Sequence, residues 1–366
     1  MSTIHAQVRL LERLPSGSRV FAEQIDGTNS VSVQLWISAK GTEETPLTNG
    51  WRHLVEHFMA KRLDTFTDER GIFLSAETSR EAMSFKFEAP ADKLSACLEG
   101  AAKLFEPIDT NGDAIAKEAQ LIRHEESGLG VARRFSRAGW AQAFENSRPD
   151  PVGELSAIAQ ATPDALKAIQ RRMLAADNLV LTICGAVEPN VAVPKFRQLL
   201  SRQLASSELP AFSPPTGATD TVKTSTPSSV GSAVCLKLEG IDRGPSLARI
   251  AFALAVAQAF PEVQPLYTVS SKSGLLTLAS SRPGVWDLTQ SITDRQLSQG
   301  PVLLKRWIAD TGRVPSRLAA FRGALLSEGS GLTLEMVQLA AAPIGFEEVK
   351  QARGEAMTAH RVEGFR

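Results

Sequence analysis

Apolar and polar residues follow recognisable periods along the N-terminal part of the chain. Residues 30–38 (SVSVQLWIS) alternate as a half-buried strand does, and residues 20–24 form a weaker strand candidate just before them. Residues 91–105 place their apolar side chains on one helical face. The same criteria predict further helices at 48–62, 113–126 and 163–174, and strands at 71–77, 82–87 and 178–186.

A similar order of elements recurs after a break in composition. Residues 206–232 are dense in Pro, Ser, Thr and Gly, which is typical of a linker that buries little apolar surface. The break predicts a first domain at 1–205, a linker at 206–232 and a shortened, related second domain at 233–366. In the second domain we expect strands at 234–238, 267–270 and 274–280, and helices at 245–259, 286–299 and 302–311. Both domains are expected to be α+β, each a mainly antiparallel sheet with helices packed on one face.

Composition narrows the class of protein. The chain has 366 residues, of which 43% are apolar and 22% charged, as in ordinary globular proteins. Lys and Arg number 40, as do Asp and Glu, so the net charge of zero gives no general support for nucleic-acid binding. The longest mainly apolar run, at 247–260, is too short to cross a bilayer, and no signal peptide is recognised. With only three scattered Cys, we expect a cytoplasmic protein with buried thiols and no membrane partner.

The predicted helix at 48–62 contains the sequence His53-Leu54-Val55-Glu56-His57. The two histidines are four residues apart and therefore lie on one helical face, where both imidazoles can reach a single Zn²⁺. Glu56 lies at the edge of the same site, where a carboxylate can take a proton from water and return it to a leaving amine. The order H-x-x-E-H is a metallopeptidase signature.

A catalytic zinc needs a third protein ligand, and the helix at 113–126 is the best source. Glu118 and Glu125 are seven residues apart and share a face of that helix. Glu125 would complete a His, His, Glu set, with Glu118 behind it to orient a histidine or the water. Glu126 and His124 are alternatives to Glu125.

These residues resemble a known family. Residues 50–58 (GWRHLVEHF) are similar to the zinc helix of the pitrilysin/insulinase family of metallopeptidases, which includes the mitochondrial processing peptidases. The resemblance extends over most of residues 10–205. It implies that His53, His57 and Glu125 bind zinc, that Glu56 is the base, and that Glu118 supports them.

The resemblance also implies a mode of substrate binding, with two departures from the family pattern. A peptide would add as an extra strand beside Leu74, Ser75, Ala76 and Glu77, where Ser75 replaces the usual Asn. Members of the family carry an Arg and a Tyr seven residues apart in the second domain, which stabilise the substrate carbonyl. Tyr267 is the only Tyr in the chain and the candidate for this role, but Phe260 stands seven positions before it.

The sequence therefore predicts a zinc-dependent endopeptidase that cleaves peptides or small unfolded polypeptides. Because the zinc motif is intact and the Arg/Tyr motif is not, we expect the chain to be the catalytic subunit of a heterodimer with a related, inactive partner. A homodimer is the alternative arrangement. Two other functions stay open: a non-catalytic scaffold of the same fold, and a zinc-dependent module that presents a peptide to another enzyme.

Overall fold

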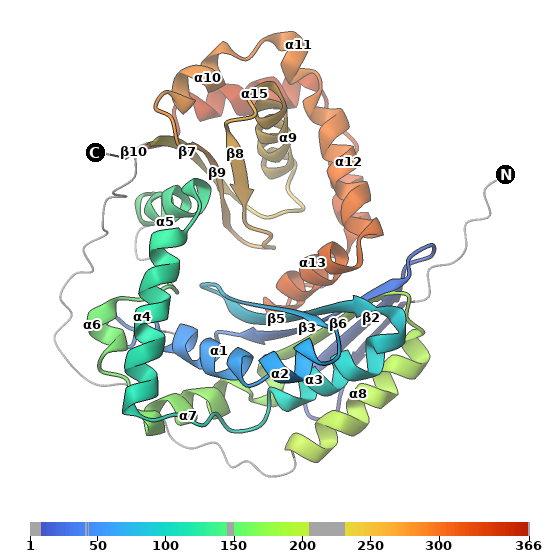
Figure 1. Ribbon diagram of the computed structural model, residues 1–366. Coiled ribbons are helices and arrows are strands. Elements are labelled where there is room, and N and C mark those ends of the chain that lie inside the picture. Colours follow the sequence, from blue (N-terminus) through green and yellow to red (C-terminus); the bar gives the residue numbers. More distant parts are fainter. Residues whose placement is uncertain (1–8, 41, 43, 145–149, 205–230, 365–366) are drawn as a thin grey trace. The chain divides into compact units, whose positions relative to one another are not determined.

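The computed structural model describes residues 9–40, 42, 44–144, 150–204 and 231–364. The chain forms two compact units, each assembled from separate segments. The first unit holds Met1–Glu126, Arg148–Asp220 and Gly312–Gly329, and the second holds Ser127–Ser147, Thr221–Thr311 and Ser330–Arg366. Each unit combines helices with a sheet of its own, which confirms the predicted α+β class (Figure 1).

The predicted domains 1–205 and 233–366 differ from these units in two segments. Helix α5 (Val131–Ala143) is part of the second unit, and helix α13 (Pro315–Ser327) is part of the first. A break in composition cannot reveal this exchange, because the sheet that a helix covers is decided by long-range packing. The predicted linker 206–232 lies outside the described residues, apart from 231–232, which begin strand β7 (Gly231–Leu238).

The sheet of the first unit has six strands in the order β1-β2-β6-β3-β5-β4. Strands β2 and β6 run parallel and all other neighbours are antiparallel, so the sheet is mixed but mainly antiparallel. The predicted strand at 30–38 is confirmed with the same bounds. The strands are β1 (Arg9–Arg13), β2 (Arg19–Gln24), β3 (Ser30–Ser38), β4 (Phe73–Thr78), β5 (Ala82–Pro90) and β6 (Leu179–Gly185).

One face of this sheet carries the main apolar core. Alternate residues of β3, namely Val33, Leu35 and Ile37, are fully buried there together with apolar residues of α1 and α3. Figure 1 shows α1, α2, α3 and α8 on this face. The helices of the first unit besides α13 are α1 (Trp51–Lys61), α2 (Asp64–Asp68), α3 (Leu94–Lys103), α4 (Gly112–Gly128), α6 (Leu155–Ile158), α7 (Pro163–Met173) and α8 (Pro189–Leu204).

The opposite face of the same sheet is covered by α13, where the sequence predicted helices on one face only. The polar residues Gln34 of β3 and Thr182 of β6 point to this face and hydrogen-bond to the helix backbone. Gln34 donates to the Ser316 carbonyl at 3.0 Å, and the Thr182 hydroxyl donates to the Ala319 carbonyl at 3.0 Å. The polar half of the alternating pattern therefore marks a second helix contact and not a solvent-exposed face.

Close packing between α13 and the sheet gives a first prediction. A Cβ at Gly323 would lie 2.0 Å from Nε1 of Trp36, so we expect Gly323→Ala to destabilise the fold by about 1–3 kcal/mol through overpacking. The matched control is Gly354→Ala in α15 (Phe346–Ala356), where a Cβ meets nothing within 4 Å. The control should be neutral or stabilising in chemical denaturation. Equal midpoints for the two variants would contradict the packing.

The sheet of the second unit has the order β10-β7-β9-β8 and is antiparallel throughout. Helix α5 packs on one face, where Phe135 contacts the residues around Cys235 and Ala279, and α9 contacts β7, β8 and β9. The remaining elements are β8 (Gln264–Tyr267), β9 (Gly274–Ser280), β10 (His360–Gly364), α9 (Gly244–Ala259), α10 (Val285–Ser291), α11 (Asp294–Leu297), α12 (Gly300–Arg313) and α14 (Leu334–Ala341).

Two predictions for the second unit need correction. The helix expected at 286–299 is two helices, α10 and α11, because the Thr293 side chain caps α11 through a capping box. The strand expected at 267–270 is β8, which ends at Tyr267. The three cysteines are buried, as expected. None of the described helices is long and apolar enough to span a membrane.

Candidate metal centre

The two histidines of the H-x-x-E-H sequence project from α1 and meet at their tips. His53 Nε2 and His57 Nε2 are 3.2 Å apart, and the ring planes are nearly perpendicular at 82°. This contact follows from the helical spacing of four residues, which places one ring above the other. Both side chains are only 12% exposed, so the pair is largely buried.

A carboxylate from α4 completes the cluster. Glu125 Oε2 lies 3.6 Å from His53 Nε2 and 3.4 Å from His57 Nε2. One ligand atom from each of these three residues lies within 4.8 Å of the other two, a spacing that can hold a metal ion. The structure thus brings together His53, His57 and Glu125. Glu125 lies 68 positions after His57 in the sequence, on a different helix. His124 and Glu126, the alternatives to Glu125, are not part of this cluster.

The outer nitrogen of each ring is held by an acceptor. His53 Nδ1 lies 3.3 Å from the carbonyl oxygen of Val152, and His57 Nδ1 lies 3.2 Å from Glu118 Oε2. A carbonyl or carboxylate oxygen can only accept, so we assign the proton of each neutral ring to Nδ1. Both Nε2 lone pairs are then directed into the cluster, alongside the Glu125 carboxylate.

Neighbouring charges shift the ionisation of Glu118 and of His53. Burial alone would raise the pKa of Glu118, but hydrogen bonds from Lys61 and His57 lower it below its usual value. Glu118 is therefore an anion that accepts from His57. Burial alone would lower the pKa of His53, but the Glu125 hydrogen bond and the nearby Glu56 carboxylate outweigh it and raise that pKa. The cluster favours positive charge.

Glu56 lies beside the cluster and outside the donor set. Its Oε2 is 3.7 Å from His53 Nε2 and accepts a hydrogen bond from the Thr78 hydroxyl at 3.1 Å. Burial raises the pKa of Glu56, against the opposing influence of His53 and His57. A carboxyl group with a raised pKa next to a metal site is suited to proton transfer near neutral pH.

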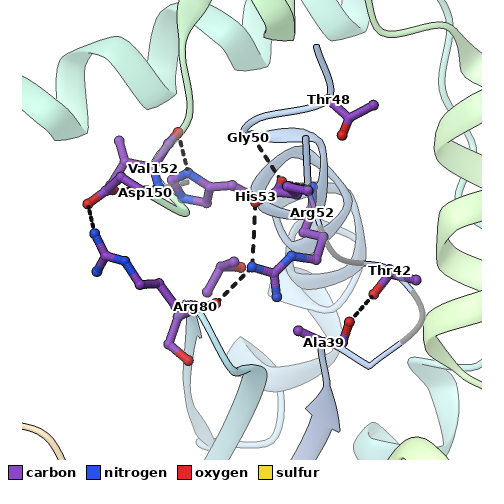
Figure 2. Close-up of polar contacts among 12 residues, drawn as sticks. Ala39, Thr42, Thr48, Gly50, Arg52, His53, Arg80, Asp150 and Val152 are labelled. Carbon is purple, nitrogen blue, oxygen red and sulfur yellow. Dashed lines mark hydrogen bonds and ion pairs between the residues drawn. The ribbon is translucent and has the colours of Figure 1, made fainter. Parts of the chain in front are cut away.

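The start of α1 is fixed by a buried ion pair between Glu44 and Arg52, which no sequence motif marks. Glu44 Oε1 accepts from the backbone N–H groups of Gly50 at 2.9 Å and of Arg52 at 3.0 Å, and so replaces a side-chain N-cap. The Arg52 guanidinium in turn donates to the Ser79 carbonyl at 3.0 Å (Figure 2). The predicted helix start at residue 48 is thereby moved to Trp51, because Gly50 adopts a left-handed conformation with φ of 91°.

The predicted substrate-binding residues lie on β4, which is the edge strand of its sheet. Leu74 and Ala76 pack against the core, while Ser75 and Glu77 point the other way, and Glu77 pairs with Lys86 at 3.1 Å. The position at the edge leaves one side of β4 without a neighbouring strand among the described residues. Their role in binding a peptide stays a prediction.

Tyr267 lies in the second compact unit, at the end of β8. Its ring makes an edge contact with Trp307, with ring centroids 5.5 Å apart. This contact is one that a packing aromatic would make, and a catalytic role for Tyr267 stays a prediction.

The comparisons with known proteins agree with the resemblance stated from the sequence. Residues 19–128 match the model of the insulinase family, peptidase family M16. This region carries His53, Glu56, His57, Glu118 and Glu125, so the resemblance to the pitrilysin/insulinase metallopeptidases is confirmed where the cluster lies.

Two relatives and one solved structure illustrate the similarity. The mitochondrial-processing peptidase subunit beta of Dictyostelium discoideum is 25% identical over 201 residues, which are 50% of this chain and 42% of that protein. An uncharacterized zinc protease of Streptomyces coelicolor is 23% identical over 217 residues, 55% of this chain and 46% of that protein. A protease from Helicobacter pylori superposes with a TM-score of 0.72 at 14% identity, over 99% of this chain and 100% of that one. The last likeness concerns the fold alone, and the chain spans less than half the length of the two relatives.

Proposed function

We propose that this chain is a zinc-dependent endopeptidase that cleaves peptides or small unfolded polypeptides, and that it is the catalytic subunit of a two-chain protease. The observation that carries the proposal is the convergence of His53, His57 and Glu125, with Glu56 at their side. If these residues were simply solvent-exposed on α1 and α4, we would not expect three donor atoms to converge on one point.

The donor set fits a zinc ion. With Nδ1 of each ring protonated, two Nε2 lone pairs face each other at 3.2 Å, an arrangement that is repulsive unless a cation lies between them. The anionic Glu125 adds a third donor from the side. Two imidazoles and one carboxylate are a common protein ligand set of catalytic zinc. His53, His57 and Glu125 would hold the ion, and Glu118 would fix the ring of His57.

The chemistry then divides between the metal and the carboxyl group of Glu56. When bound, zinc acts as a Lewis acid that polarises a peptide carbonyl and makes water more acidic. Glu56 accepts the proton of the attacking water and returns it to the leaving amine. The Thr78 hydroxyl donates to Glu56 Oε2 and so fixes the carboxylate in one rotamer while it does this.

The edge strand supports the class of substrate. Thr78, which donates a hydrogen bond to Glu56, is the last residue of β4. The strand that carries the predicted peptide-binding residues therefore also contacts the proposed base. A peptide that adds beside Leu74, Ser75, Ala76 and Glu77 uses main-chain hydrogen bonds and requires an extended, unfolded segment. We therefore propose unfolded polypeptides as substrates, not folded proteins.

Two observations support the proposed partner. One of the two relatives is named as a subunit. The position seven residues before Tyr267 is Phe260, which has no charge to offer a substrate carbonyl. We propose that a related chain supplies this contact, with a second copy of the present chain as the alternative.

The test is to measure bound zinc and peptide cleavage in the same preparation. We expect about one zinc per chain by elemental analysis. Cleavage of an unstructured, fluorogenic peptide should rise when a related chain encoded nearby is added. Zinc without cleavage in either sample would favour a peptide-presenting module, and a chain that is fully active as a monomer would overturn the two-chain arrangement. Absence of zinc would overturn the proposal that the chain is a zinc-dependent endopeptidase.

A further inference from the structure

A series of polar contacts leads from the turn between β4 and β5 to the metal centre. The Arg80 guanidinium donates to Asp150 Oδ2 at 2.9 Å, and Asp150 Oδ1 accepts from the Val152 N–H at 3.0 Å. The carbonyl of the same Val152 accepts from His53 Nδ1 at 3.3 Å. Figure 2 shows Arg80, Asp150, Val152 and His53 in this order. Neither Arg80 nor Asp150 belongs to the donor set.

Both oxygens of Asp150 are engaged in this arrangement. One holds the guanidinium, and the other holds the backbone two residues further on, as an Asp side chain does in an Asx turn. The side chains of Arg80 and Asp150 are 14% and 20% exposed. An ion pair this well shielded is more geometrically defined than one on the open surface, so Asp150 has a fixed place from which to hold the Val152 peptide group.

Glycine contacts bring this loop to the start of α1. Gly50 and Gly153 both have a φ of 91° and lie back to back. A Cβ at Gly153 would be 2.3 Å from the Cα of Gly50, and a Cβ at Gly50 would be 2.8 Å from the Cα of Gly153. The loop can therefore approach the helix closely enough for the Val152 carbonyl to reach His53, three residues after Gly50.

We propose that Arg80 and Asp150 are positioning residues of the metal centre. They hold the Val152 carbonyl on His53 Nδ1, which fixes the ring orientation and leaves the Nε2 lone pair directed at the metal position. The proposal rests on the proposed zinc site. It also means that the turn after the predicted peptide-binding strand carries a residue on which the geometry of a metal ligand depends.

The experiment compares zinc affinity and stability in the full-length chain. Asp150→Ala and Arg80→Ala should each weaken zinc binding by about 10- to 100-fold, as the loss of a group that orients a metal ligand does. Affinity is measured by competition with a chromophoric chelator. The double variant should lose little more than the weaker-binding single variant, because the two residues act in one series of contacts. Arg80→Lys should recover part of the affinity.

A second readout separates positioning from a merely structural role. The absorption bands of Co²⁺ bound in place of zinc should change in Asp150→Ala, because they respond to ligand orientation. Arg353→Ala is the matched control, since Arg353 pairs with Asp294 at 3.4 Å in the second unit and should leave zinc affinity and the Co²⁺ spectrum unchanged. Thermal unfolding of the metal-free proteins shows whether each variant is folded.

Several results would overturn the proposal. If Asp150→Ala and Arg80→Ala lower the unfolding temperature but keep the zinc affinity and the Co²⁺ spectrum, the ion pair is structural only. If Asp150→Ala does not fold, Arg80→Ala and Arg80→Lys carry the test, because they change only the guanidinium that anchors Asp150. Unchanged affinity and an unchanged Co²⁺ spectrum in Arg80→Ala then refute the positioning role, while normal zinc binding by the unaltered chain leaves the proposed enzyme intact. An unaltered chain without zinc refutes both.

Discussion

Glu56→Gln is expected to abolish peptide cleavage while the protein keeps its zinc. Gln has the shape of Glu and its amide oxygen can still accept from the Thr78 hydroxyl, but it cannot take a proton from water. Loss of one proton-transferring side chain lowers turnover by about 10²- to 10⁴-fold. The measurement is the cleavage rate of a fluorogenic peptide together with the zinc content of the same sample.

The stability of this variant distinguishes lost chemistry from lost folding. Burial raises the pKa of Glu56, so its ionised form costs folding free energy, and neutral Gln removes that cost. The metal-free variant should therefore unfold at the same temperature as the unaltered chain or a higher one. Glu69→Gln, at a side chain that is 67% exposed, is the control and should leave cleavage unchanged. Retained activity in Glu56→Gln would end the assignment of Glu56 as the base.

His57→Ala is expected to lose bound zinc. The substitution removes one of three donors and leaves Glu118 without its His57 partner. The loss of affinity should exceed the ~100-fold limit that is typical for a residue behind the ligands. Elemental analysis after dialysis gives the zinc content, and cleavage should disappear with it.

The control for this prediction lies on the neighbouring helix. His124 is exposed on α4, next to Glu125 in sequence but outside the cluster of donor atoms, so His124→Ala should keep both zinc and activity. This control also tests the alternative that His124, not Glu125, completes the donor set. Loss of zinc in His124→Ala with retention in Glu125→Ala would reverse that choice.

The sequence predicts the parts of the site that depend on local periodicity. The meeting of His53 and His57 follows from a spacing of four residues in a helix, and Glu125 and Glu118 share a face because they are two turns apart. Which of Glu125, Glu126 and His124 is the third member of the donor set depends on how α4 is rotated about its axis relative to α1. Rotation is a property of packing between distant elements, which the sequence of either helix does not contain.

Other parts of the site carry no signal in the sequence. The acceptor for His53 is the backbone carbonyl of Val152. Every residue type has a backbone carbonyl, so the residue type at position 152 does not reveal this contact. The partnership of Arg80 with Asp150 joins residues 70 positions apart and becomes visible only when the loop lies on the helix. Lys61, in contrast, lies four residues after His57, and helical spacing alone could have suggested its contact with Glu118.

The fold shows the same division between local and distant information. Strand β3 has the predicted bounds because alternation is a local property. Helix α13 was not predicted, and its two hydrogen bonds to the first sheet join residues 137 and 282 positions apart. Gln34, on the polar side of the strand predicted as half-buried, in fact hydrogen-bonds to the backbone of α13, as does Thr182 of β6.

The paired glycines offer a way to sort related chains by eye. Any side chain at position 50 or 153 would act as a wedge between the loop and the helix, and the loop would be pushed off the histidine that it steadies. A homologous sequence that retains both histidines but has a bulky residue at either of these two positions is expected to have a lower affinity for zinc. Substitution of one of these glycines would then indicate a non-catalytic homologue even where all the proposed zinc ligands are present.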